Sequence, residues 1–122
     1  NDFVIMREWV RERAVNMVRG NARHGTTGII RIAEDLARIG MKIELNGPGG
    51  LFGHVHAQLV AGIGNTSYYE YFPDGSRDTI GKEIGLQNPP VPVKGEIKLT
   101  ERPGWGYEFD WEYFNKKRVR VF

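Results

Sequence analysis

The sequence predicts an α/β fold with a parallel sheet, on two observations. Three short apolar or aromatic segments, 14–18, 41–45 and 67–71, begin 27 and then 26 residues apart. Helical patterns fill both intervals and also precede the first segment. Strands that are joined through helices run parallel, and a parallel sheet needs helices to cover it.

Residues 2–14 form the first predicted helix, which leads into the strand at 14–18 and has Val4, Trp9 and Val10 as inner positions. The second predicted helix covers 26–40 and separates an apolar face from a charged one. Its inner positions are Ile29, Ile32, Ala33, Leu36 and Ala37. Thr26 or Thr27 can cap its start, and Gly40 can end it before the strand at 41–45.

The third predicted helix, 51–64, carries a similar apolar stripe that ends at Gly64 and precedes the strand at 67–71. The stripe consists of Leu51, Val55, Leu59 and Ile63. A regular unit of about 26 residues favours a TIM (β/α)8 barrel over a doubly wound sheet, because such barrels use about 30 residues for each βα unit. Residues 1–82 therefore correspond to about three βα units, the C-terminal portion of an incomplete barrel.

Residues 83–122 differ in texture from the first part of the chain. They hold four of the six prolines, with extended pieces at 91–93 and 96–99 and a basic tail or final strand at 115–122. This segment lacks the periodicity for a core of its own, so we expect an extended return segment that packs on another surface. Its expected anchors are Trp105, Tyr107, Phe109, Trp111 and Phe114.

The composition excludes several classes of protein. The net charge is only +2, from 17 basic and 15 acidic residues, so we expect no nucleic-acid partner. The absence of cysteine excludes disulfides and thiolate chemistry and suits the reducing cytoplasm. No apolar run approaches the roughly 18 residues of a membrane span, so we expect no membrane partner.

Four stretches carry a resemblance to a known family. They are NDFVIMREWVRERAVNMV, GTTGIIRIAEDLARIGMKIEL, GNTSYYEYF and NPPVPVKGEIKLTERPGWGYEFDW, in this order. Together they resemble the enolase superfamily, in particular the acid-sugar dehydratases related to mandelate racemase and muconate lactonizing enzyme. The stretches look like the last strands and helices of the barrel and the return that leaves it.

The resemblance implies a lyase that removes a proton next to a carboxylate and then eliminates water from a sugar acid. It implies Mg²⁺ as cofactor, with carboxylate ligands upstream of this chain and no metal ligand within residues 1–122. It also implies that the remainder of the barrel and an N-terminal capping domain are partners of these residues. We further expect a homo-oligomer.

The resemblance assigns three catalytic candidates. The Asp that the family usually has on its sixth strand falls on Asn21 when counted forward, or on Arg19 when counted back from the following Thr-Gly pair. The His of the seventh strand falls on Asn46, and Glu70 matches an acid that hydrogen-bonds the substrate carboxylate. An amide cannot take a proton at neutral pH, so the general base is expected upstream or absent.

Each candidate also has a plainer explanation. Asn46 precedes Gly-Pro-Gly-Gly and suits a left-handed turn, whereas Glu70 suits either a raised pKa and a donated hydrogen bond or an ordinary salt bridge. His24 in a loop and His54 at a helix start are predicted to contact substrate, with solvation and core packing as the alternatives. His54 and His56 lie about 200° apart on a helix, which argues against a shared metal.

Two other functions remain open from the sequence. The chain could belong to a non-catalytic sugar-acid-binding or structural homologue, because the usual His/Asp pair is replaced by amides. It could also be a free-standing small α/β module with an unrelated ligand.

Overall fold

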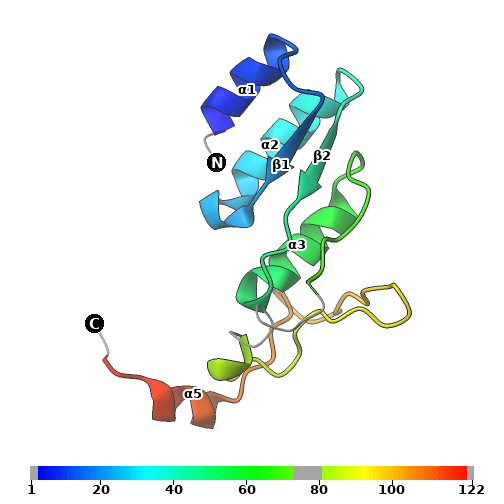
Figure 1. Ribbon diagram of the computed structural model, residues 1–122. Coiled ribbons are helices and arrows are strands. Elements are labelled where there is room, and N and C mark those ends of the chain that lie inside the picture. The colour runs from blue at the N-terminus through cyan, green and yellow to red at the C-terminus, as the bar shows by residue number, and fades with distance from the viewer. Residues whose placement is uncertain (1–2, 73–80, 121–122) are drawn as a thin grey trace.

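The computed structural model describes residues 3–72 and 81–120. Figure 1 shows the elements, with the strands beside α1 and α2 and the C-terminal segment gathered around the start of α3. The described elements are α1 (Phe3–Arg11), β1 (Met17–Gly20), η1 (Ala22–His24), α2 (Thr26–Ala37), β2 (Lys42–Leu45), α3 (Gly50–Gly62) and α5 (Trp111–Lys117). Among these residues, no helix has both the length and the apolar character needed to cross a membrane.

The two strands β1 and β2 pair in parallel, as the sequence predicts. Their register runs from Met17 opposite Lys42 to Gly20 opposite Leu45. The chain crosses from one strand to the next through α2, which is the connection that parallel pairing requires. The arrangement is α/β and is consistent with a partial barrel.

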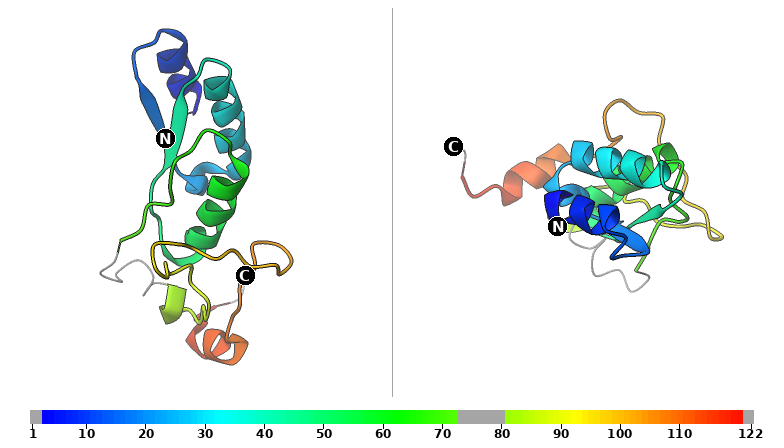
Figure 2. Two further views of the ribbon diagram at one scale, coloured as in Figure 1. Left: turned by 90° about the vertical axis from the view of Figure 1, so that its right-hand side faces the viewer. Right: turned by 90° about the horizontal axis from the view of Figure 1, so that it is seen from above.

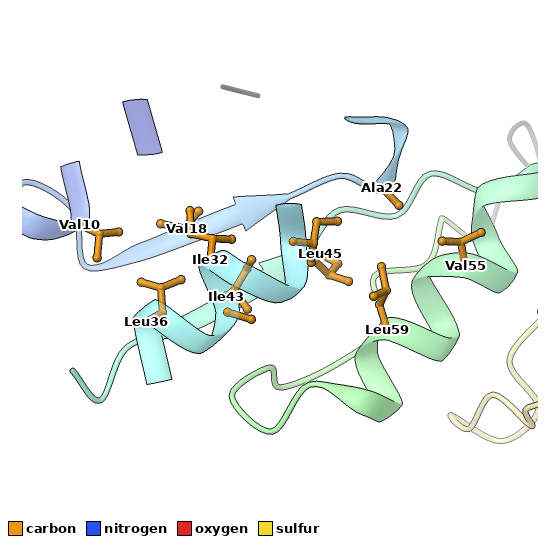
Figure 3. Packing of buried hydrophobic residues seen from close by; sticks show 11 residues of the cluster. Val10, Val18, Ala22, Ile32, Leu36, Ile43, Leu45, Val55 and Leu59 are labelled. Carbon is orange, nitrogen blue, oxygen red and sulfur yellow. The ribbon is translucent and has the colours of Figure 1, made fainter. Parts of the chain in front are cut away.

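Helices cover one face of this small sheet, and Figure 2 shows α2 and α3 on the same side of the strands. Val18, Ile43 and Leu45 turn to this side, where they meet the apolar face of α2 (Figure 3). The α2 residues that the sequence predicts as inner, Ile29, Ile32, Ala33 and Leu36, are buried, whereas Ala37 is exposed. Full burial of each large aliphatic side chain stabilises the fold by about 1.5–3 kcal/mol.

The first strand begins three residues later than the sequence predicts, at Met17 rather than at residue 14. The end of α1 explains the difference, because the N–H of Ala14 donates to the carbonyl of Trp9 at 2.9 Å and Arg13 adopts a φ of 52°. Residues 12–16 therefore close the helix before the chain extends. Of the predicted inner positions of α1, Val10 is buried, while Val4 and Trp9 are exposed.

The prediction of a third strand at 67–71 is wrong, because the sheet contains only β1 and β2 among the described residues. The segment still runs beside β2, and the N–H of Ile43 donates to the carbonyl of Asn65 at 3.1 Å. Two residues on, the N–H of Ser67 donates to the Glu44 side chain instead of to a main-chain carbonyl. The Glu44 side chain therefore accepts the Ser67 N–H, which would donate to a main-chain carbonyl in a regular pair of parallel strands.

The C-terminal segment packs on α3, with short antiparallel bridges in place of the predicted extended pieces. Leu86 pairs with Phe109, and Val93 pairs with Glu96. The hydroxyl of Tyr107 donates to the carbonyl of Leu51 at 2.5 Å. Of the predicted anchors, Trp105 and Trp111 remain exposed.

The prediction of a basic tail or final strand at 115–122 is wrong for residues 115–117, because they belong to α5. Asp110 caps this helix, because its carboxylate accepts the N–H of Tyr113 at 2.9 Å. Lys116 pairs with Glu112 one turn earlier at 2.6 Å. Val119, beyond the helix, is exposed.

Candidate functional site

Asn21 and Asn46 lie at the same edge of the sheet. Each directly follows a strand, and the last residues of the two strands, Gly20 and Leu45, are register partners. The N–H of Asn46 donates to the carbonyl of Gly20 at 3.1 Å, which continues the parallel pairing past the assigned strands. The two candidates therefore sit side by side at the carboxyl ends of parallel strands.

Glu70 joins this edge from the segment that follows α3. One carboxylate oxygen accepts from an Nη of Arg19 on β1 at 2.5 Å, and the other accepts the N–H of Gly47, the residue after Asn46. Gly47 has no space for a Cβ, which would collide with the main-chain oxygen of Glu70 and the ring of Phe72. The carboxylate of Glu70 thus links three segments that are distant in sequence.

The partners of Glu70 define its role in this arrangement. Both Arg19 and the Gly47 amide are hydrogen-bond donors, so both carboxylate oxygens act as acceptors. The sequence predicts that Glu70 either donates a hydrogen bond or forms a salt bridge. The structure shows the salt bridge, with Arg19. Its carboxylate lies beside the ends of β1 and β2, although residues 67–71 form no strand, and its catalytic role stays a prediction.

The Asn21 side chain is partly engaged by its own loop. Its Oδ1 accepts the N–H of Arg23 at 2.9 Å, which caps the short helix η1. This use of the oxygen leaves the amide nitrogen as the group that can donate to a ligand. Arg19, the alternative position for the same family residue, lies two residues earlier on the strand.

Asn46 does not need the left-handed backbone that the turn explanation invokes. The non-glycine residues with positive φ among those described are Arg13 and Lys94. Asn46 instead keeps its main chain in line with β2, and its carbonyl accepts a hydrogen bond from His56.

His56 on α3 fixes this edge, a role that the sequence did not indicate. Its Nε2 accepts the N–H of Ala22 at 2.8 Å, and its Nδ1 lies 2.7 Å from the carbonyl of Asn46. Because Nε2 accepts, the ring is neutral and Nδ1 carries the proton that it donates to Asn46. Burial lowers the pKa of His56 to about 4, the bond to Asn46 partly opposes that shift, and the charge of Arg23 adds to it.

The other two histidines are placed differently. His54 is buried, its Nε2 lies 2.5 Å from the carbonyl of Asn88, and its ring meets the Tyr107 ring edge-on. These contacts hold the C-terminal segment against α3, and none of them involves Asn21, Asn46 or Glu70. His24 lies in η1 beside the site, and its side chain falls outside the described structure.

Glu44 is a second carboxylate on the strand face opposite the helices. It is 4% exposed and accepts from the hydroxyl of Thr66 at 3.2 Å and from the N–H of Ser67. Burial raises its pKa, but the hydrogen bonds from Ser67, Thr66 and the Tyr68 N–H outweigh burial and hold the pKa below its usual 4.5. Glu44 therefore anchors the segment after α3 to β2.

These residues do not fit a magnesium site. Within residues 3–72 and 81–120, no three His, Asp or Glu side chains group closely enough to hold a metal ion. The Glu70 oxygens are bonded to Arg19 and Gly47, and the Glu44 oxygens to Thr66 and Ser67.

Comparison with known proteins agrees with this geometry. The family described as "Enolase C-terminal domain-like" matches residues 1–113. The chain belongs to this family. Membership in the enolase superfamily accounts for the α/β arrangement with parallel strands. Searches of curated proteins and of solved structures gave no match.

Proposed function

We propose that the chain is the C-terminal part of an enolase-superfamily dehydratase that acts on sugar acids with Mg²⁺. The reaction breaks the C–H bond next to the carboxylate and the neighbouring C–O bond, forms an enol, and releases water. Mg²⁺ would stabilise the negative charge that develops on the substrate carboxylate. Its ligands are proposed to be carboxylates outside residues 1–122.

The observation that carries the proposal is the meeting of Asn21, Asn46 and Glu70 at one sheet edge. In barrel enzymes this edge forms the mouth in which substrate binds. The amide nitrogen of Asn21 can donate to a hydroxyl of a sugar acid, and the amide of Asn46 can both donate and accept hydrogen bonds. Neither amide can abstract the proton, so the base is proposed to come from outside this chain.

The same amides favour a second candidate, a homologue that binds sugar acids without converting them. Such a protein would keep the polar strand ends, and it would need no base. The two candidates differ in turnover and not in binding, so one experiment separates them.

The experiment measures both binding and dehydration of a sugar-acid library by the complete protein with Mg²⁺. Product appearance identifies the dehydratase, and binding without product identifies the second candidate. Glu70→Gln should lower kcat/KM at least about ten-fold, because the neutral amide loses the charge that holds Arg19. Glu108→Gln is the matched control, since Glu108 also pairs with an arginine, Arg102, at 2.9 Å, but in the C-terminal segment.

A further inference from the structure

We infer that Arg19 binds the substrate's carboxylate at the sheet edge. The inference rests on the proposed function, because it assigns a recognition role within the same site. In it, Glu70 acts as the group that orients Arg19, rather than as a direct hydrogen-bond donor to the substrate.

Arg19 lies on the face of β1 that the helices do not cover. Buried and exposed residues alternate along the strand, with Val18 and Gly20 buried toward the helices and Arg19 on the opposite, open face. Arg19 is the next-to-last residue of β1 and lies two residues before Asn21, so it shares the edge of the candidate site. Its side chain is 54% exposed, which leaves the guanidinium accessible to a small ligand.

An ion pair with Glu70 holds the guanidinium of Arg19. One Nη of Arg19 donates to Glu70, while the other oxygen of Glu70 is fixed by the N–H of Gly47. A guanidinium has five N–H donors in a planar fork. The described bond to Glu70 uses one of them, so Arg19 can stay anchored and still present donors to a second carboxylate.

The groups around Arg19 carry charges of both signs. Glu44 is its register partner on β2, but the Glu44 carboxylate is bonded to Thr66 and Ser67. Arg23 adds a second cation in the loop after β1 and lies 5.9 Å over the ring of Phe52. Two arginines and two carboxylates therefore balance at this edge, and a substrate carboxylate is favoured by its match to the planar fork of Arg19.

Isothermal titration calorimetry on the complete protein tests this assignment. The probes are a panel of five- and six-carbon aldonates. Each aldonate is paired with the sugar alcohol in which a CH2OH group replaces the carboxylate. Arg19→Gln should weaken aldonate binding about 10- to 100-fold, since it removes a charge-assisted hydrogen-bond pair, and should leave sugar-alcohol binding unchanged. Arg19→Lys should recover part of the affinity because it keeps the charge without the fork.

Arg7→Gln is the matched control, because Arg7 on α1 also pairs with a carboxylate, Asp35, at 2.7 Å, and its side chain is 45% exposed. It should leave aldonate binding unchanged. A purely structural role for Arg19 would weaken acid and alcohol equally, with no recovery in Arg19→Lys. That result overturns the inference, as does aldonate affinity in Arg19→Gln within two-fold of wild type, or no aldonate binding by the wild-type protein.

The binding and turnover measurements test the two proposals separately. If aldonates bind through Arg19 but no sugar acid is dehydrated, the dehydratase proposal falls and the assignment of Arg19 stands. If a sugar acid is dehydrated and Arg19→Gln binds it as tightly as wild type, the assignment falls and the dehydratase proposal stands.

Discussion

His56 and Ala22 are joined by a hydrogen bond in which the buried imidazole Nε2 accepts the main-chain N–H at 2.8 Å. Through its other nitrogen the same ring holds the carbonyl of Asn46, so one side chain of α3 ties together the loops that follow both strands. The bond to Ala22 exists only while the ring is neutral. The edge that carries the candidate site is therefore sensitive to protonation at a residue that is 1% exposed.

A pH dependence of stability follows from the His56 pKa of about 4, against 6.5 for an ordinary histidine. Because the unfolded chain binds the proton more readily, His56 stabilises the fold fully above pH 6.5. This contribution, of about 3 kcal/mol at most, is lost as the pH falls from 6.5 to 4. Denaturant unfolding of the complete protein between pH 4 and pH 7 measures it.

His56→Gln separates the contribution of His56 from that of the carboxylates, because carboxylates titrate in part of the same pH range. The difference in unfolding free energy between wild type and variant should shrink as the pH falls from 7 to 4. Val55→Ala, a neighbouring core change on α3, should cost about 1–2.5 kcal/mol and keep the wild-type pH slope. An equal slope in wild type and His56→Gln would show that His56 does not hold the two loops as a neutral acceptor.

Glu44→Gln should destabilise the protein at pH 7 by about 1–3 kcal/mol, because the Thr66 hydroxyl and the Ser67 N–H lose an ionised acceptor. The pKa of Glu44 lies below 4.5, so its contribution is present above pH 4.5 and is lost as the pH falls through the lowered value. Chemical denaturation at pH 7 and at pH 3 compares the two conditions. Glu34→Gln, at an exposed position of α2, should change stability by less than about 0.5 kcal/mol.

Gly47→Ala should disturb the candidate site directly. The added Cβ would meet the main-chain oxygen of Glu70 and the Phe72 ring, so the loop must move and the bond from Gly47 to the Glu70 carboxylate is weakened. We expect a loss of about 1–3 kcal/mol in unfolding free energy and a lower kcat/KM. Gly62→Ala at the end of α3 meets no atom within 4 Å and should leave both quantities near wild type. Wild-type turnover in Gly47→Ala would separate the Glu70 contact from the activity.

Residues 1–122 expressed alone should unfold without a sharp transition. Among the described residues the sheet has two strands, and its face opposite the helices carries charged side chains such as Arg19 and Lys42. A sheet of this size seldom stabilises a domain, and we propose that further strands of a barrel extend it on both sides. Thermal unfolding followed by circular dichroism would contradict this expectation if a monomer melted cooperatively at high temperature.

The sequence predicts the parallel pairing and the buried face of α2 well, because both follow from local periodicity. Long-range contacts limit the rest. The third strand fails because the Glu44 side chain takes the Ser67 N–H, and no local pattern reveals that bond. The role of His56 is hidden because α3 is buried on most of its surface, so its periodicity does not indicate which histidine faces the strands.

The missed helix α5 is a different case, because its signals are present in the sequence. Asp110 is a good N-cap, and Glu112 and Lys116 are spaced one turn apart. The nearby prolines and aromatics favour an extended segment instead. At the candidate site, the family resemblance indicates Asn21, Asn46 and Glu70, whereas the ion pair of Arg19 with Glu70 joins residues 51 positions apart and leaves no local pattern.

The most direct test of the central claim is a crystal structure of the complete protein with the aldonate that it binds most tightly. The account predicts that the ligand lies at the carboxyl ends of β1 and β2, with its carboxylate on Arg19 and its hydroxyls within hydrogen-bond distance of Asn46. A ligand seated elsewhere would contradict the account, for example in the hollow of about 630 Å³ that Ala57, Tyr69 and Ile97 help to line.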